Sequence, residues 1–212
     1  MKVFGGASAT PLPRSFYARP TLEVARDMLG ALLVRRWKGR YLTGRIVEVE
    51  AYIGEKDPAC HAYRGRTPRN EVMYGAPGHA YVYFTYGMHC LLNAVTEPVG
   101  FPAAVLIRAL EPLAGVEQMR RLRASTSPRP DKKAFPDREL TSGPARLCAA
   151  LKIDLTLNGS DLTAPPVFLA ASSLPTVGVR WSSRVGIRAG RDRLWRAYLE
   201  GNPFVSRSRL PR

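Results

Sequence analysis

Five strand-like segments in the first half of the chain set the strongest limit on the fold. Each is rich in Val, Ile, Leu or Tyr, residues that fit a pleated sheet, and Lys-Gly, Pro-Gly and Pro-Val-Gly stretches punctuate the chain between them. Strands separated by such turns are typical of antiparallel sheets. The sequence therefore predicts a largely antiparallel sheet built from residues 31–37, 41–52, 79–86, 89–96 and 103–110.

Three further segments carry apolar residues at helical spacing, at residues 19–30, 111–123 and 142–153. Thr21 is the candidate N-cap of the first, which ends at Gly30; the third has Ser142 at its cap and Pro144 in its first turn. The rest of the chain, including residues 184–190 and 193–206, is expected to form short strands that close the sheet. Together these elements predict an α+β fold in which helices flank the sheet.

The chain has 212 residues and no obvious linker, a length that one hydrophobic core can serve. We therefore expect a single domain over residues 1–212. The first 15 residues are expected to be flexible. The stretch at residues 124–137, rich in Ser, Thr, Pro and Lys, is expected to form an exposed, mobile loop.

A surplus of positive charge is the strongest global signal of function. The chain has 32 Lys and Arg against 17 Asp and Glu, a net charge of +15 and a pI near 10.4. This favours a polyanionic partner, nucleic acid first and an anionic membrane second. Because the sequence has no signal-peptide core and no apolar run of about 18 residues, we expect a cytosolic protein that does not span a membrane.

The three cysteines, Cys60, Cys90 and Cys148, are odd in number and lack CxxC spacing. This argues against a disulfide framework and against a zinc knuckle. The Cys60-His61 and His89-Cys90 pairs would each offer one metal ligand at most, because adjacent residues of a strand point to opposite faces. We expect no metal site.

Two carboxylates stand out in the strand-like stretch RIVEVEAY, residues 45–52. A side-chain period of two places Glu48 and Glu50 on one face with Ile46 and Tyr52, while the alternate apolar residues go to the core. The acidic face must then meet solvent, a cleft or charge partners. A soluble edge strand is the bland interpretation, and a spacing of roughly 7 Å between the two glutamates does not decide which of them would be catalytic.

Tyrosines and arginines follow closely on this strand. Tyr81 and Tyr83 share one strand face, and Tyr86 stands beside Gly87, where a tight turn would leave the tyrosine at a hairpin tip. A loop rich in turn residues adds three arginines, Arg64, Arg66 and Arg69. Tyrosines at this density pack on sheet faces about as readily as they stack on unpaired bases, so the residues alone support both interpretations.

A nucleic-acid strand at this surface would give the glutamates a chemical role. A carboxylate in the path of a polyanion repels the phosphates that the rest of the surface attracts, so its presence needs a reason. An ionised carboxylate can take a proton from a water molecule that attacks a sugar carbon. Its charge also stabilises the cationic sugar that develops as a glycosidic bond breaks.

Motifs along most of the chain form a specific combination. They are RIVEVEAYIGEKDPACHAYRGRTPRNEVMYGAPGHAYVYFTYGMHCLLNAV, then VLIRALEP, with flanking stretches that run from FYARPTLEVARDMLG through RELTSGPARLCAAL to RVGIRAG and GNPFVS. In this order they resemble the alkyladenine (3-methyladenine) DNA glycosylase family of base-excision repair. The resemblance implies a single mixed domain with a curved antiparallel sheet. It also implies a monofunctional enzyme that flips a damaged purine from duplex DNA and hydrolyses its N-glycosidic bond without metal or cofactor.

The resemblance assigns the catalytic role to Glu50, the second glutamate of V-E-x-E-A-Y, and leaves Glu48 as a supporting acid. Arg108 would help to place the attacking water and hold Glu50 ionised. Tyr86 would be the wedge that fills the gap left by the flipped nucleotide. The implied base pocket comprises Tyr52, His61, Tyr83, Asn93, which would oppose the exocyclic amino group of guanine, and the backbone at Val185.

The expected partner is double-stranded DNA containing damaged purines, bound by a monomer. The arginine loop is expected to contact the DNA backbone through Arg64, Arg66 and Arg69. No lysine lies on the Glu50 strand or between Tyr81 and Asn93, which favours hydrolysis over an imine-forming lyase reaction. Val49 stands where the family often has threonine, a departure that concerns pocket shape and substrate range.

Two other functions remain open at this level. The chain could be a basic, β-rich module that binds nucleic acid without catalysis, with Glu50 as a surface acid. A metal-dependent nuclease would need ligands such as Glu48, Glu50 and Asp57, which form no convincing cluster in the sequence.

Overall fold

An eight-stranded antiparallel sheet dominates the computed structural model, which describes residues 2–4, 7–8, 10–85, 87–126, 135–173, 176 and 178–207. Its main path runs β5-β6-β7-β4-β10-β9, and β3 pairs with both β4 and β8. The strands are β3 (Leu32–Trp37), β4 (Arg40–Ile53), β5 (Ala80–Thr85), β6 (His89–Val95), β7 (Ala103–Ala114), β8 (Val167–Ala170), β9 (Val179–Ser182) and β10 (Arg196–Leu199). Strands β1 (Lys2–Phe4) and β2 (Ala7–Ser8) form a separate pair.

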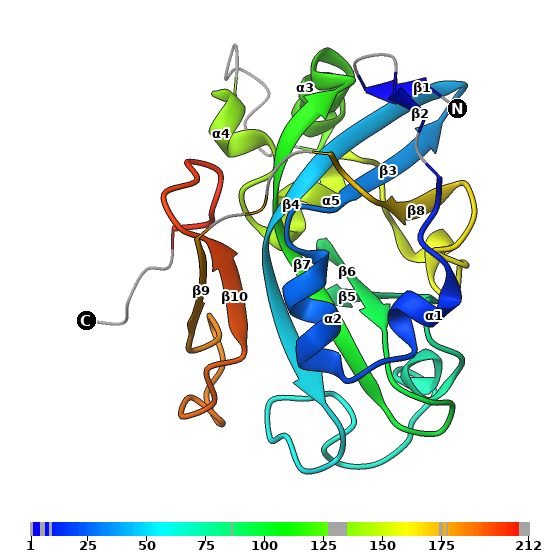
Figure 1. Ribbon diagram of the computed structural model, residues 1–212, viewed down its shortest axis with the longest axis vertical. Coiled ribbons are helices and arrows are strands. Elements are labelled where there is room, and N and C mark those ends of the chain that lie inside the picture. Colours follow the sequence, from blue (N-terminus) through cyan, green and yellow to red (C-terminus); the bar gives the residue numbers. More distant parts are fainter. Residues whose placement is uncertain are drawn as a thin grey trace.

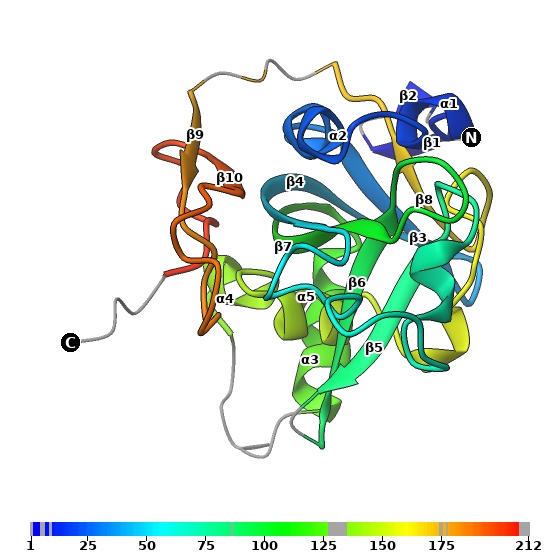
Figure 2. The ribbon, with the colours of Figure 1, turned by 90° about the horizontal axis from the view of Figure 1, so that it is seen from below.

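The helices are short and lie in the connections between strands along the chain. They are α1 (Arg14–Tyr17), α2 (Thr21–Met28), α3 (Val116–Ser125), α4 (Asp137–Leu140) and α5 (Pro144–Ala150), with 3-10 turns η1 (Glu71–Tyr74) and η2 (Leu155–Leu157). Figures 1 and 2 show the long strands β4 and β7 curving beside α2 and α5. The predicted α+β class with a curved, antiparallel sheet and flanking helices is confirmed.

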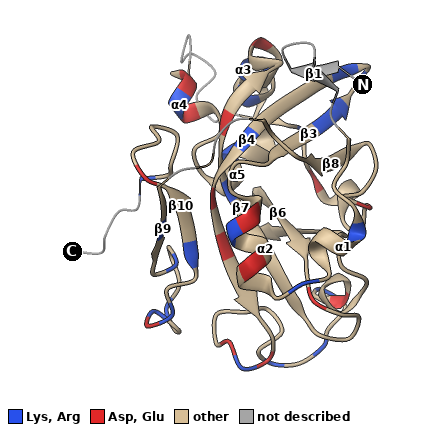
Figure 3. Cartoon of the chain, viewed as in Figure 1, with Lys and Arg blue, Asp and Glu red and all other residues tan. Residues whose placement is uncertain are grey.

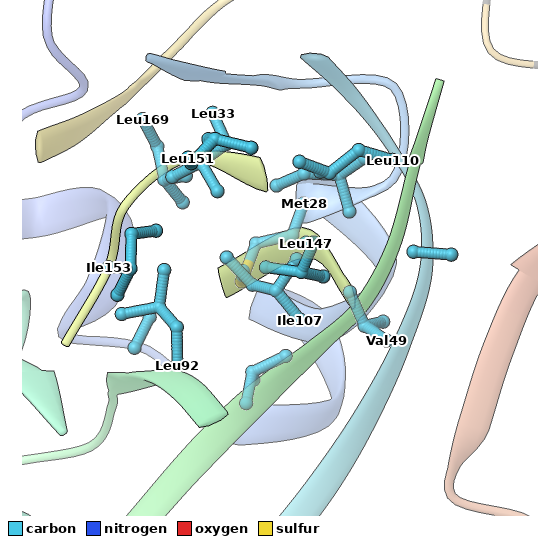
Figure 4. Packing of buried hydrophobic residues seen from close by; sticks show 14 of the residues in the cluster. Met28, Leu33, Val49, Leu92, Ile107, Leu110, Leu147, Leu151, Ile153 and Leu169 are labelled. Atoms are coloured by element: carbon cyan, nitrogen blue, oxygen red, sulfur yellow. The ribbon is translucent and has the colours of Figure 1, made fainter. Parts of the chain in front are cut away.

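Alternation along β4 and β7 separates the core from the other face of the sheet. Val47, Val49 and Ala51 of β4 enter the main hydrophobic core, as do Val105, Ile107 and Ala109 of β7. Figure 4 shows Val49 and Ile107 near Met28 of α2 and Leu147 of α5. The residues between them in sequence, including both glutamates of β4, therefore point away from this core.

Two offsetting irregularities interrupt the middle of the pairing of β4 with β7, apart from a separate shift between Thr43 and Gly44. Ile46 pairs with Leu110 and Glu48 with Ala109, so Val47 is an extra residue in β4; Val49 then pairs with Ile107, so Arg108 is an extra residue in β7. Because the second shift cancels the first, the register beyond them is the same as before. Bulges of this kind re-aim side chains and are frequent beside active sites.

The bulge corrects one part of the sequence prediction. Strict alternation placed Ile46 on the acidic face, but Ile46 is buried in the main core together with Val47, because the extra residue breaks the period of two. The edge-strand interpretation is also wrong, since β4 lies inside the sheet between β7, β3 and β10. Figure 3 marks acidic positions in the middle of this strand.

Helix boundaries differ from the predicted ones at their beginnings. Pro20, not Thr21, is the N-cap of α2, because the Thr21 hydroxyl instead donates to Glu97 Oε1 at 2.8 Å. Helix α3 begins only at Val116, after β7 has continued to Ala114 and Gly115 has turned the chain with a φ of 74°. Helix α5 is capped by Gly143 rather than Ser142.

Three other segments were singled out in the sequence. Residues 184–190, expected to be a strand, form part of the connection between β9 and β10. Within the first 15 residues, α1 begins at Arg14, whose guanidinium pairs with Asp161 at 2.6 Å. Of the stretch 124–137, residues 127–134 lie outside the described residues.

Candidate active site

A cavity of about 330 Å³ lies on the face of the sheet opposite the main core. Ala104, Leu106 and Arg108 of β7 form part of its wall, in alternation with the core residues of that strand. Tyr52 of β4, strands β5 and β6, and the connection between β9 and β10 contribute further lining residues. The segment between β4 and β5 adds Ala59, His61 and Met73, and Pro144 of α5 completes the wall. Every residue assigned to the base pocket from sequence lines this cavity: Tyr52, His61, Tyr83, Asn93 and Val185.

Glu50 is fully buried directly behind this wall. The Val185 backbone N–H donates to Glu50 Oε1 at 2.6 Å, while the Tyr52 hydroxyl and Arg108 Nη1 donate to Oε2 at 2.9 and 3.1 Å. All three donors belong to residues that line the cavity. Burial and then the Glu50 charge raise the pKa of Tyr52 well above its usual value, so Tyr52 remains a hydrogen-bond donor.

Glu48, two residues earlier, is equally buried and contacts the same arginine. Arg108 Nε donates to Glu48 Oε1 at 2.9 Å, and Arg196 Nε donates to the same oxygen at 2.7 Å. Burial alone would raise the pKa of Glu48, but Arg108 and Arg196 outweigh it and hold that pKa below its usual value. The pKa of Arg108 is raised, because the two carboxylates outweigh the cost of burying its charge.

The backbone at Val185 is held in place by a second buried ion pair. Arg184, the preceding residue, donates to both oxygens of Asp57, at 2.6 and 2.7 Å, and to the Ala51 carbonyl at 2.9 Å. Its guanidinium also stacks over the ring of Tyr52, 4.7 Å from the centroid. Arg184 therefore anchors the loop that presents the Val185 N–H to Glu50, through its ion pair with Asp57 and its stacking on the Tyr52 ring.

The side of the cavity formed by β5 is aromatic. The ring centroids of Tyr81 and Tyr83 are 5.4 Å apart, and the His61 ring lies 4.5 Å from Tyr83. His61 Nδ1 and the Tyr81 hydroxyl are hydrogen-bonded at 2.8 Å. Desolvation of the ring, followed by the charge of Arg69, lowers the pKa of His61 to about 4, so the imidazole is neutral over the ordinary pH range.

Asn93 lies buried on β6, opposite Tyr81 in the sheet. Its amide nitrogen donates to the Tyr81 carbonyl at 3.0 Å. This bond fixes the orientation of the amide group in the cavity wall. The side-chain carbonyl oxygen thus has a defined direction, as a residue that discriminates between ligands requires.

The three loop arginines are exposed but differ in their contacts. Arg69 lies at the cavity, with its guanidinium 5.6 Å from the Tyr83 ring centroid and a hydrogen bond of 3.4 Å to the Phe84 carbonyl. Arg66 pairs with Glu71, its Nε at 2.8 Å from Oε2. Arg64 is exposed in the same loop. Tyr86, predicted to be the wedge, lies outside the described residues.

A second and larger cavity, of about 520 Å³, shares Arg108 with the first. Helices α4 and α5 and the segment at residues 203–207 surround it. Three exposed arginines reach it, Arg138, Arg146 and Arg207. Arg108 therefore stands between an aromatic cavity and a strongly cationic one.

Several contributors to the site had no role in it assigned from the sequence. Tyr81 lines the cavity beside Tyr83. Because the two tyrosines are two residues apart on one strand, they share a face of the sheet, and this spacing could have assigned Tyr81 to the cavity. Asp57 was considered only as a metal ligand, whereas the structure pairs it with Arg184. Arg196 lies far from Glu48 in sequence, so only the pairing of β10 with β4 brings them together.

The described residues contain no group of three or more His, Cys, Asp or Glu placed to hold a metal ion. Glu48, Glu50 and Asp57 each pair with an arginine instead. Among the helices of this part of the chain, none combines the length and the apolar character needed to cross a bilayer.

Comparisons with known proteins identify the family of this chain. The model of the methylpurine-DNA glycosylase family matches residues 15–203. A protein of Carboxydothermus hydrogenoformans is 51% identical over 92% of this chain and 98% of its own length, and one of Methanocella arvoryzae is 50% identical over 92% and 96%. A Streptomyces avermitilis protein is 46% identical over 96% and 95%.

All three relatives carry the name "Putative 3-methyladenine DNA glycosylase". The family model covers most of the chain, and each of these relatives is matched over nearly its full length. The resemblance drawn from the sequence motifs is therefore confirmed, together with the predicted enzyme class, a hydrolase of N-glycosyl bonds. This chain belongs to the methylpurine-DNA glycosylase family of DNA repair enzymes.

Proposed function

We propose that this protein is a monofunctional DNA glycosylase that takes alkylated or deaminated purines from duplex DNA into the aromatic cavity and hydrolyses their N-glycosidic bond with a water activated by Glu50. The observation that carries the proposal is the position of Glu50. Its carboxylate is buried behind three cavity-lining residues and is bonded to each of them. In a module that only binds nucleic acid, an acid on the surface would not need to be buried or to accept hydrogen bonds from three cavity-lining residues.

The hydrogen bonds to Glu50 leave room for one more donor. A carboxylate has about four lone-pair sites. Oε2 accepts two hydrogen bonds and Oε1 accepts one, from Val185. Among the described residues, Oε1 therefore retains a free lone pair, to which a water molecule can donate.

The aromatic wall supports an electron-poor ligand. The faces of Tyr52 and Tyr83 attract cations, by about 0.5–2 kcal/mol for each favourable contact. A purine alkylated on a ring nitrogen carries a positive charge, whereas an ordinary base does not. His61 is neutral and adds no competing charge to the wall.

The hydrolysis then balances without a cofactor. The water oxygen forms a bond to the sugar C1′ while its proton passes to Glu50, and the bond from C1′ to the purine nitrogen breaks with its electron pair on the base. A cationic alkylated base leaves as a neutral molecule. The negative charge of Glu50 stabilises the cationic sugar until the water adds, and Asn93 would oppose the amino group of guanine at the cavity wall.

The test is single-turnover base release from a panel of duplexes that carry alkylated adenine, alkylated guanine, hypoxanthine or etheno lesions. We expect Glu50→Gln to slow release by at least about 100-fold, while the affinity for lesion DNA stays within a few-fold of wild type. Glu117→Gln is the matched control, because Glu117 is a carboxylate on α3 with 79% of its side chain exposed.

Full activity of the Glu50→Gln variant would refute the proposal. Binding of all four lesions without base release by the wild-type protein would instead favour the non-catalytic module. Release that disappears in EDTA and returns with a divalent metal would support the metal-dependent alternative.

A further inference from the structure

Glu48 accepts four hydrogen bonds and does not itself line the aromatic cavity. Its Oε1 accepts from Arg108 Nε, Arg196 Nε and the Ser206 hydroxyl, at 2.9, 2.7 and 2.8 Å. Its Oε2 accepts from the Ser206 backbone N–H at 2.7 Å. These four bonds use about the whole accepting capacity of a carboxylate. Glu48 therefore has less accepting capacity left for a water than Glu50, which accepts three such bonds.

The charges around Glu48 are balanced. Two buried carboxylates, Glu48 and Glu50, face two buried guanidinium groups, Arg108 and Arg196. A buried charge without a partner is strongly destabilising, so each member depends on the others. Arg196 contacts only Glu48 of the two acids, which makes Glu48 the residue that links Arg196 to Arg108.

The position of Arg108 determines how many lone pairs of the Glu50 carboxylate remain free to accept a hydrogen bond from water. Glu48 holds the Nε of Arg108, and only Nη1 reaches Glu50, at 3.1 Å. An arginine released from this hold would tend to form two parallel bonds with a single carboxylate, the favoured geometry for the pair. Such a bidentate contact would occupy the remaining lone pair of Glu50 Oε1.

We propose that Glu48, with Arg196 and Ser206, is a positioning set that restricts Arg108 to a single contact with Glu50 and so leaves one oxygen of Glu50 open to the attacking water. This inference rests on the proposed function. It assigns to Glu48 the orientation of Arg108 and no contact with the substrate. Ser206 lies in the segment after β10, so this segment is tied to the site through Glu48.

A pH profile separates this role from a purely structural one. The charged or titratable groups that act on Glu50 are Tyr52 on β4, Arg108 on β7, Tyr83 on β5 and Arg184 in the β9–β10 connection. Glu48 on β4 shares Arg108 with Glu50, and Arg196 on β10 pairs with Glu48. Replacement of Glu48 by Gln removes one negative charge from this group and leaves both arginines. Because the lost carboxylate no longer repels the negative charge of Glu50, we expect the acid-side fall of the rate to move to lower pH.

The experiment compares single-turnover rates of Glu48→Gln, Glu48→Gln/Arg196→Met and Ser206→Ala across pH, below the melting temperature of each variant. We expect Glu48→Gln to lower the plateau rate about 10- to 100-fold, the range for a misplaced group next to the reacting atoms, and to shift the acid limb downward. The double variant removes one charge of each sign, so its acid limb should return toward that of wild type. Ser206→Ala keeps the backbone donor and should lose only a few-fold in rate.

Two results would overturn the inference. One is a wild-type rate in Glu48→Gln, and the other is a reduced rate with an acid limb that stays at the wild-type pH in both the single and the double variant. Failure of the proposed function itself is distinguishable, because wild-type protein would then release no base, or Glu50→Gln would release it normally.

Discussion

Charges buried beneath the cavity and charges on the rim of the cavity follow opposite rules. Beneath it, Glu48, Glu50 and Asp57 are each paired with arginine at 3.1 Å or less, with carboxylate side chains that are fully buried. The loop at residues 64–69, here called the rim because it follows the cavity residue His61, carries Arg64, Arg66 and Arg69. All three are exposed, and of these only Arg66 is paired with a carboxylate, Glu71, within the part of the chain that is described. The interior is charge-balanced, whereas the rim carries the surplus.

This difference separates two uses of arginine in one small region. A buried guanidinium has a fixed partner and sets the geometry of another group, because an unpaired buried charge is too costly to tolerate. An exposed guanidinium keeps its hydration and acts at longer range on a polyanion, with a strength that depends on salt. Substitutions in the two regions should therefore change different measured quantities.

The largest effect is expected from Asp57→Asn, which leaves the buried Arg184 without its carboxylate. We expect a loss of about 3–5 kcal/mol in the free energy of unfolding, measured by denaturant titration. Asp27→Asn is the matched control, since Asp27 pairs with Arg19 at the surface and should cost no more than about 1 kcal/mol. Equal losses in the two variants would remove the distinction between interior and surface pairs.

Tyr83 lies between the two regions, because it lines the cavity and Arg69 stacks on its ring. Replacement by Leu should preserve apolar packing but remove the cation–π attraction, about 0.5–2 kcal/mol. We expect slower release of a cationic methylated purine relative to neutral hypoxanthine, by roughly 2- to 30-fold. Tyr63→Leu is the control, as Tyr63 is an exposed tyrosine that does not line the cavity. An unchanged preference would assign Tyr83 to packing alone.

On the rim, Arg64→Gln and Arg69→Gln should weaken DNA binding moderately and reduce its salt dependence. Each lost phosphate contact lowers the slope of log affinity against log salt by about 0.9. Arg66→Gln should change the slope less, because Glu71 already pairs with this guanidinium. Affinity measurements at several salt concentrations provide the slopes. Identical slopes in all variants would exclude these arginines from the DNA interface.

At neutral pH the smallest effect concerns His61, with its pKa lowered to about 4. Between this value and the usual pKa near 6.5, the unfolded chain binds a proton that the folded protein does not. His61 should therefore contribute to a loss of stability as the pH falls through that interval, with no contribution above it. NMR titration of the ring should give a midpoint near pH 4, and Arg69→Gln should raise it. A midpoint of 6 or above would mean that the ring is hydrated like an ordinary surface histidine.

The sequence predicted the fold and the cavity residues well where the information is local. Alternation on β4 placed Glu48, Glu50 and Tyr52 together, and strand composition predicted β3 to β7. Failures occurred where distant segments decide the outcome. The position of Ile46 depends on a bulge against β7, and the partner of Glu48 on β10 is set only when the sheet closes.

The site assignments illustrate the same limit. The family motifs supplied the base-pocket residues, but the hydrogen bonds that connect Val185 and Arg108 to Glu50 could not be inferred from spacing. These bonds depend on how the loop that carries Val185 packs against β4 and β7 in three dimensions. Turn chemistry explains the helix starts that were misplaced, because Gly115 and Gly143 end the preceding segments by their backbone conformation.

The cancelling shifts in β4 and β7 have a consequence for the redesign of lesion preference. Because the extra Val47 is offset by the extra Arg108, both strands resume the same frame before Glu50 and Leu106. A chimera that exchanges the ends of both strands with those of a relative should keep every cavity-facing side chain correctly directed. If a graft carried only one of the two insertions, the later residues of that strand would face the wrong side, and no choice of side chains could repair the pocket.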